Sequence, residues 1–216
     1  MPNEIDYGYK MAFYWPIAQL AEHEAVNFGV PGSSPGGGVW AIGAAVAQLL
    51  YTQTVIGSNP ILPTYKYFKK IMDELYELLH KSQTSLFCLF QKTWVYHWNV
   101  VGSDFYQLHT VFGNQYETMF EEIDKLTEHM RYLRMKAIGP ISRVVETSEL
   151  PEASNAPTSE SMISQLLSDN KKLIEMLTEV SESADGQKLY ATSNLVQEII
   201  ETHGKFVWML RSFLKE

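Results

Sequence analysis

The stretch His97–Gly113, HWNVVGSDFYQLHTVFG, joins two long amphipathic segments and decides the fold. Gly102 and Ser103 interrupt the helical pattern in its middle. Ser103 or Asp104 can then cap a new helix, because a short oxygen-bearing side chain accepts one of the N–H groups that a helix start leaves free. The stretch therefore predicts the junction between two consecutive helices.

Outward from this junction, apolar residues recur at three- and four-residue spacing, which is typical of helices that bury one face. No strand-like alternation follows residue 71. Four helices and a long connection over 140–157, with room for a short helical turn, predict an all-α bundle. The expected helices run from Ile71 to about Trp98, from Ser103 or Asp104 to Ala137 before Gly139-Pro140, from Thr158 or Ser159 to a turn at Asp185-Gly186, and from there through Leu214.

Residues 1–68 differ from the rest of the chain. They contain PGSSPGGG at 31–38, few charges and no sustained helical period, so we expect a poorly structured N-terminal extension before a single domain at 69–216. AQLAEH at 18–23 and GSNP at 57–60 match translated D-arm and T-arm sequences of tRNA genes, which suggests a spurious extension read from an upstream start codon. A weak membrane segment at 39–56 is the alternative, but it is too short and too polar to favour insertion.

The charge and the cysteine content of the chain narrow the range of possible functions. The formal net charge is −8, and residues 1–70 carry four basic and four acidic residues, so all the net negative charge falls on 71–216. Such a surface favours cations and repels phosphate backbones. Cys88 is the single cysteine and lies in an apolar helical run, which predicts a buried, reduced thiol and excludes a cysteine metal cluster.

The run HWNVVG at 97–102, followed twelve residues after its histidine by His109, resembles the signature of the Dps family of miniferritins. The last helix, HGKFVWMLRSFL at 203–214, resembles that family's final helix. The resemblance implies a ferritin-like four-helix bundle and a cytoplasmic, iron-storing homododecamer. It further implies ferroxidase activity, with hydrogen peroxide or dioxygen as the electron acceptor, and protection against oxidative damage.

The resemblance also implies the metal ligands and their arrangement. His97 and His109 would come from one subunit, and Asp124 and Glu128 from its twofold-related partner. The residues themselves support this set, because His109, Asp124 and Glu128 fall within an arc of about 100° on one helix. Imidazole nitrogen together with carboxylate oxygens and no thiolate suits Fe(II).

One position departs from the family pattern. The family usually has an aspartate one helical turn after the second histidine, and this chain has Gly113 there. Glu117, one turn further along the same arc, is a candidate replacement ligand, and water is another. The expected consequence is weaker or altered iron binding.

Other readings remain open. Asp124 and Glu128 could belong to a solvated helix face, as we expect for Glu117, Glu121 and Glu122, and His97 could be an ordinary core histidine. The remaining histidines of 69–216 match no ligand position and are expected to be structural or surface groups: His80, His129 and His203. A DNA-compacting protein is the alternative function, although only Lys66, Lys69 and Lys70 precede the first helix. A scaffold that lost its iron centre through Gly113 is a third.

Overall fold

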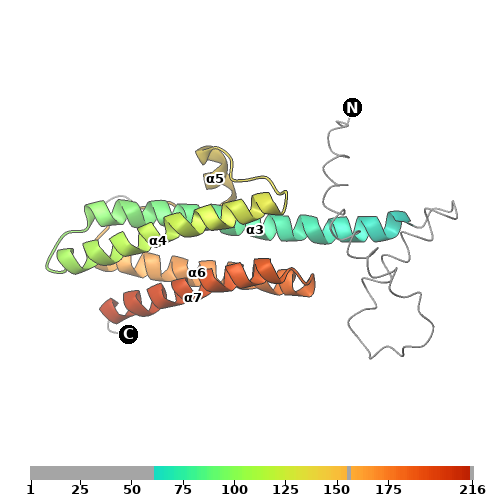
Figure 1. The fold of residues 1–216 in the computed structure, drawn as a ribbon. Coiled ribbons are helices and arrows are strands. Elements are labelled where there is room, and N and C mark those ends of the chain that lie inside the picture. The colour runs from blue at the N-terminus through green and yellow to red at the C-terminus, as the bar shows by residue number, and fades with distance from the viewer. Residues whose placement is uncertain (1–60, 155–156, 215–216) are drawn as a thin grey trace, which may run out of the picture. The chain divides into compact units, whose positions relative to one another are not determined.

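The computed structural model describes residues 61–154 and 157–214, and within them the chain is helical with no strand (Figure 1). Four long helices and one short helix follow one another: α3 (Ile61–Asn99), α4 (Phe105–Tyr132), α5 (Ile141–Thr147), α6 (Ser159–Gly186) and α7 (Tyr190–Leu214). The expected all-α four-helix bundle is confirmed, with α5 as the helical turn inside the long connection.

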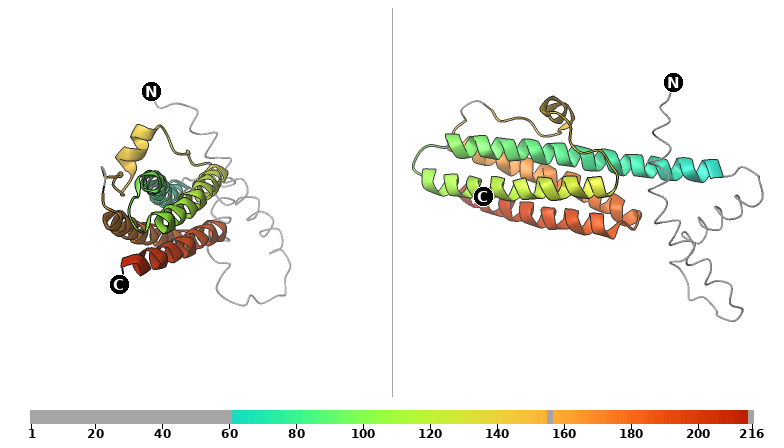
Figure 2. Two further views of the ribbon diagram at one scale, coloured as in Figure 1. Left: turned by 90° about the vertical axis from the view of Figure 1, so that its left-hand side faces the viewer. Right: turned by 45° about the horizontal axis from the view of Figure 1, so that its top comes forward.

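Hydrogen bonds between side chains show which helices are neighbours. Lys92 bonds Asp169 and Tyr96 bonds Gln165, so α3 and α6 lie side by side and run in opposite directions. Other bonds join α3 to α4, α4 to α7 and α6 to α7. The four long helices therefore surround one core, and α5 lies outside it (Figure 2).

The helix ends differ from the predicted ones. α3 begins at Ile61, so residues 61–68 of the predicted extension are helical. α4 ends at Tyr132 and not at Ala137. Arg134 takes a left-handed φ of 60°, its N–H bonds the carbonyl of Arg131, and the N–H of Met135 bonds that of Met130. This is the Schellman arrangement that usually has glycine at its left-handed position.

The second turn is similar. Lys188 has a φ of 59°, two residues beyond the predicted Asp185-Gly186 turn, and closes α6 with the same pair of backbone bonds. At the other end of α6, Thr158 accepts a hydrogen bond from the N–H of Ser161, which confirms the predicted cap. Predictions that concern residues 1–60, including the membrane segment, lie outside the described residues.

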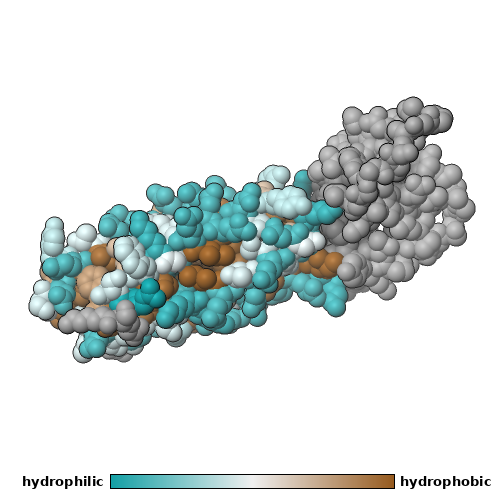
Figure 3. All heavy atoms as spheres, turned by 90° about the horizontal axis from the view of Figure 1, so that it is seen from below, coloured by the Kyte–Doolittle hydropathy of each residue, from teal (hydrophilic) through white to brown (hydrophobic). Residues whose placement is uncertain are grey.

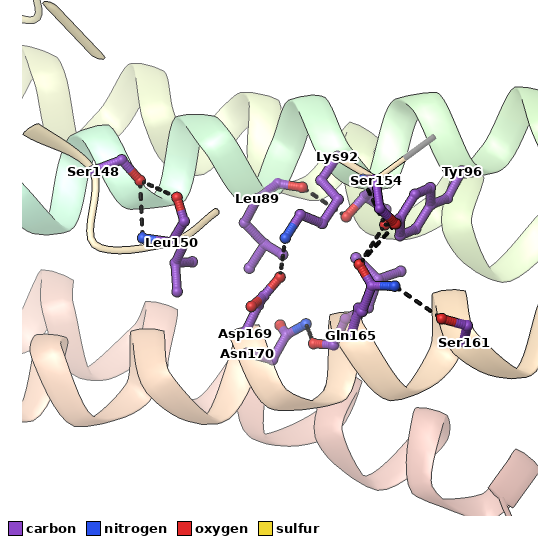
Figure 4. Close-up of polar contacts among 12 residues, drawn as sticks. Leu89, Lys92, Tyr96, Ser148, Leu150, Ser154, Ser161, Gln165, Asp169 and Asn170 are labelled. Carbon is purple, nitrogen blue, oxygen red and sulfur yellow. Dashed lines mark hydrogen bonds and ion pairs between the residues drawn. The ribbon is translucent and has the colours of Figure 1, made fainter. Parts of the chain in front are cut away.

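The core consists mainly of leucine from all four long helices, together with other aliphatic and aromatic side chains, and is crossed by a layer of charged and polar groups. Lys92 on α3 is 1% exposed and lies 2.6 Å from the carboxylate of Asp169 on α6 (Figure 4). His203 on α7 is fully buried between Asn170 on α6 and Glu122 on α4. Cys88 is free and buried, as predicted.

A second polar network fixes the long connection to the bundle. The hydroxyl of Tyr96 donates to Gln165 on α6 at 2.8 Å and accepts from the backbone N–H of Ser154 at 3.4 Å (Figure 4). Near α5, Ser85 of α3 accepts the N–H of Glu149. These bonds hold the segment between α4 and α6 against α3.

The surface of the bundle carries polar groups and exposed aromatic side chains. Seen from below, the side formed by α6 and α7 is mostly hydrophilic, with a narrow strip of apolar side chains between polar ones (Figure 3). Large aromatic side chains are exposed on α3 and α4, namely Trp94 (37%), Trp98 (57%), Phe105 (44%) and Phe120 (64%), and on α7, namely Tyr190 (61%) and Trp208 (59%). Among the described residues, no helix has the length and hydrophobicity needed to cross a membrane.

Candidate metal centre

His97 and His109 form a close pair at the junction of α3 and α4. Their rings stack with centroids 3.7 Å apart and planes inclined by 21°. Nδ1 of His97 lies 2.7 Å from the backbone oxygen of His109, and Nδ1 of His109 lies 2.9 Å from the backbone oxygen of His97. Each imidazole is thus hydrogen-bonded to the backbone oxygen of the other histidine.

These two bonds determine the tautomer of both rings. A carbonyl oxygen only accepts hydrogen bonds, so each Nδ1 must carry the proton. In the neutral imidazole the lone pair is then on Nε2, which is the atom free to bind a metal. Metal-binding histidines commonly donate their second N–H to a carbonyl or carboxylate in this way, which orients the ring before the metal arrives. The donor set fits a divalent transition metal.

Aromatic side chains surround the pair. The ring of Tyr116 meets that of His97 edge to face at 5.2 Å, and Phe105 stacks on His109 at 5.1 Å. The ring centroid of Trp94 lies 6.0 Å from that of Tyr116 and 4.5 Å from that of Trp98. The two histidines, both partly exposed, therefore lie at the border of the exposed aromatic surface of α3 and α4.

Asp124 and Glu128 do not join the histidines within one chain. Both are exposed on α4, and Asp124 lies fifteen residues beyond His109, which at about 1.5 Å per residue is about 22 Å along the helix. Among the described residues, no three histidine, cysteine or acidic side chains come close enough to hold a metal ion together. One subunit alone brings together the two imidazoles and neither carboxylate.

Gly113 and Glu117 lie between these two groups. Gly113 is buried beside the His97 ring: a Cβ at this position would lie 3.3 Å from Cε1 and 3.4 Å from Nδ1 of His97. Glu117 is exposed, about 12 Å along the helix from His109, and makes no described contact with either histidine. Glu117 thus remains a predicted candidate.

The expectation that Glu122 lies on a solvated helix face is wrong. Glu122 is 6% exposed and does not belong to a solvated face, since its carboxylate lies 3.1 Å from Nε2 of His203. The amide of Asn170 donates to the carbonyl of Leu166, which turns its oxygen toward Nδ1 of His203 at 2.6 Å. Both nitrogens of His203 are engaged, so this histidine is structural, as expected. His129 bonds Thr192 at 2.8 Å, and burial lowers the pKa of His129.

Comparison with known proteins identifies the family. The ferritin-like domain family matches residues 76–216. DNA protection during starvation protein 2 of Bacillus anthracis is 29% identical over 143 residues, which cover 66% of this chain and 98% of that protein. The chain belongs to the Dps miniferritins of the ferritin-like family.

Other proteins are also similar to this Dps chain. An uncharacterized low temperature-induced protein of Nostoc sp. is 33% identical over 140 residues, which cover 64% of this chain and 78% of the relative. A Dps crystal structure from Bacillus brevis matches with a TM-score of 0.65 at 28% identity, covering 67% of this chain and 97% of that one. Antigen TpF1 of Treponema pallidum has the same fold, with a TM-score of 0.66 at 24% identity. Iron storage and protection are the general functions of this family.

Two further features of this Dps chain were not predicted from its sequence. One is the buried Lys92–Asp169 pair, and the other is the contact of Gly113 with His97. The first had a signal, because Lys92 lies three residues after Leu89 and four before Tyr96, in the buried stripe of α3. The second had none, because a glycine in a helix does not reveal which side chain lies against it.

Proposed function

We propose that this Dps protein binds Fe(II) between two subunits, oxidises it with hydrogen peroxide or dioxygen, and stores the ferric product inside a hollow dodecamer. The single observation that carries the proposal is the anchored pair of His97 and His109. Both Nδ1–H groups are bonded to backbone oxygen and the two rings are stacked, so each ring keeps its Nε2 lone pair for a metal.

The partner subunit would supply the missing carboxylates. Positions 109 and 128 share a midpoint between Thr118 and Met119 with positions 113 and 124. Two α4 helices packed antiparallel about a twofold axis at that midpoint would therefore bring Glu128 of the partner subunit opposite His109. A twofold contact uses the same surface on both copies, so it creates two such sites per dimer.

The exposed aromatic side chains support the same contact. Phe105 stacks on His109, and the rings of Trp94 and Phe120 both lie against that of Phe90 on α3. Exposed apolar groups gathered in this way are typical of a surface that another protein covers. A second copy on this surface would bury the aromatic rings and complete the ligand set in one step.

The chemistry requires little from the protein beyond ligands and charge. Hydrogen peroxide takes one electron from each of two Fe(II) ions and, with two protons, yields two molecules of water. The imidazoles and carboxylates would hold Fe(II) and stabilise the Fe(III) product, for which anionic oxygen ligands are suited. The net charge of −8 favours the approach of cations.

Anaerobic Fe(II) titration followed by addition of oxidant tests the activity. The wild type should bind Fe(II) saturably and oxidise it rapidly, and His97→Ala/His109→Ala should lose both properties. His80→Ala is the matched control, because His80 lies on α3 away from the pair, beside Tyr76. Unchanged oxidation in the double variant would favour the scaffold or DNA-compacting alternative.

Co-expression of two inactive variants tests the shared site. His97→Ala/His109→Ala retains its carboxylates, and Asp124→Ala/Glu128→Ala retains its imidazoles. In a mixed twofold dimer one of the two sites is complete, so random pairing should restore roughly a quarter of the wild-type sites. A mixture as inactive as either parent, or an active carboxylate variant, would contradict a site shared between subunits.

A further inference from the structure

Gly113 lies where the resemblance to other Dps proteins leads one to expect a ligand, so its surroundings matter. Its backbone is packed against the imidazole of His97, and a Cβ on residue 113 would meet Cε1 at 3.3 Å and Nδ1 at 3.4 Å. Contacts this short are rarely seen for a real Cβ, so the ring would have to shift by a few tenths of an ångström. The space at residue 113 is occupied by His97.

The hydrogen bond of His97 explains why this space is needed. Nδ1 of His97 donates to the carbonyl oxygen of His109 at 2.7 Å. In a helix the carbonyl of residue i points along the axis toward residue i+4, whose N–H it accepts. The His97 ring that donates to the carbonyl of His109 lies beside residue 113, where a Cβ would meet it.

The hydrogen bond from His109 to the carbonyl of His97 does not need an open space beside a helix. The carbonyl of His97 lies in the last turn of α3, which ends at Asn99, so it has no N–H of its own helix to accept. Nδ1 of His109 donates to this free carbonyl at 2.9 Å. Of the two bonds that orient the imidazoles, only the one from His97 enters the side of an intact helix, and only that one has a glycine beside it.

Contacts on the other sides leave the ring little freedom to move. The His109 ring stacks on it at 3.7 Å, and the Tyr116 ring meets it edge to face at 5.2 Å. A shift away from residue 113 must lengthen the 2.7 Å hydrogen bond, disturb this stacking, or do both. Either change would move the Nε2 atom, whose direction the bond at Nδ1 determines.

We propose that Gly113 is a positioning residue, which admits the His97 imidazole to the carbonyl of His109 and thereby directs Nε2 of His97 toward the metal. This proposal rests on the function proposed above. In this chain the absence of a carboxylate at position 113 is then not a lost ligand. The glycine serves the arrangement of the ligand that remains.

Alanine substitutions at two helical glycines give a matched test in the full-length protein. Gly113→Ala adds a Cβ against His97, whereas Gly204→Ala on α7 adds one with no atom within 4 Å. Both replace glycine by a better helix former, so neither should lower the melting temperature through helix propensity. We expect Gly113→Ala to weaken Co²⁺ binding at least tenfold and Gly204→Ala to leave it unchanged.

Nitrogen-15 NMR of the histidine side chains supplies a readout that needs no metal. The wild type and Gly204→Ala should show His97 protonated at Nδ1, with that proton protected from exchange. Gly113→Ala should lose the protection while the signals of His203 stay in place. An unaltered His97 signal in Gly113→Ala would overturn the proposal whether or not the protein oxidises iron, so its failure is distinct from that of the proposed function.

Gly113→Asp separates a positioning residue from a lost ligand. It restores the carboxylate that the family usually has, but its Cβ meets the same ring atoms. We expect Co²⁺ affinity no higher than in the wild type, together with the altered His97 signal. Binding at least tenfold tighter than in the wild type would show that residue 113 is a vacant ligand position and would refute the positioning role.

Discussion

The ion pair of Lys92 and Asp169 offers a strong test of how the bundle is stabilised. Lys92 is 1% exposed, and its ammonium lies 2.6 Å from the carboxylate of Asp169, which is 6% exposed. Replacing Lys92 by Met keeps the volume but leaves the carboxylate without its counter-charge. Breaking a buried pair from one side costs about 3–5 kcal/mol in the free energy of unfolding. We expect Lys92→Met to lose an amount in this range at pH 7.

The double variant separates the value of the pair from the cost of an orphaned charge. Lys92→Met/Asp169→Leu removes both charges and fills the space with apolar atoms, so it should recover most of the loss and come within about 1 kcal/mol of the wild type. Urea unfolding followed by circular dichroism measures all three proteins. One protein concentration must be used throughout, because assembly also contributes to stability.

The pH dependence gives the prediction its sign. Burial raises the pKa of Asp169 above its usual 3.8, and the hydrogen bond and charge of Lys92 act in the opposite direction. Without Lys92 the folded-state pKa should rise further. A carboxyl group with a raised folded-state pKa is protonated more readily in the folded chain, so its contribution to stability is present at low pH and lost as pH rises through the folded pKa. The deficit of Lys92→Met should therefore be smaller at pH 5 than at pH 7.

Two results would refute this reasoning. One is a loss below about 1 kcal/mol in Lys92→Met at pH 7, which would mean that water or a rearranged side chain solvates Asp169. The other is a deficit that does not change between pH 7 and pH 5, since an unpaired buried carboxylate can escape its cost by taking up a proton.

Three further predictions concern helix ends and a histidine. Arg134→Gly should raise the free energy of unfolding by about 1 kcal/mol in urea, because a left-handed φ of 60° strains any residue with a Cβ. Thr158→Ala should lower it by about 1 kcal/mol, measured in the same way, because the N–H of Ser161 loses its acceptor. His129 has a pKa lowered by burial, so its contribution to stability is present above its unfolded value of 6.5 and lost as pH falls below it. The melting temperature of the wild type should therefore fall more between pH 7.5 and pH 5.5 than that of His129→Gln, and equal falls would contradict this assignment.

Helical periodicity was sufficient to predict the bundle, but not where its helices end. Apolar spacing depends on burial along a whole face, and it identified all four long helices. The ends depend on single residues. Arg134 and Lys188 take the left-handed position that sequence rules assign to glycine, while Gly139 lies beyond α4 and Gly186 is the last residue of α6. Nothing in the side chain of an arginine indicates that it will accept this strain.

The polar layer of the core could have been predicted with one more rule. Glu122 lies three residues after the buried Met119 and four before the buried Leu126, which places it in the apolar stripe of α4. Lys92 occupies the same kind of position on α3, and Asp169 on α6. A charged residue in the register of a buried stripe must find a partner within the core, because leaving it unpaired is costly. Glu121, one residue away, is exposed because it lies about 100° around the helix.

The charged layer and the histidine pair differ in whether one chain can complete them. Lys92 and Asp169, and likewise Glu122 and His203, meet across neighbouring helices of one bundle. His109 and Asp124 lie on one continuous helix, about 22 Å apart along its axis, and no movement of the other helices can shorten that separation. His109 and Glu128 lie at equal distances from the midpoint between Thr118 and Met119, so the twofold pairing of two α4 helices that we propose would bring one opposite the other. The spacing within α4 therefore supports the proposed assembly as well as the proposed chemistry.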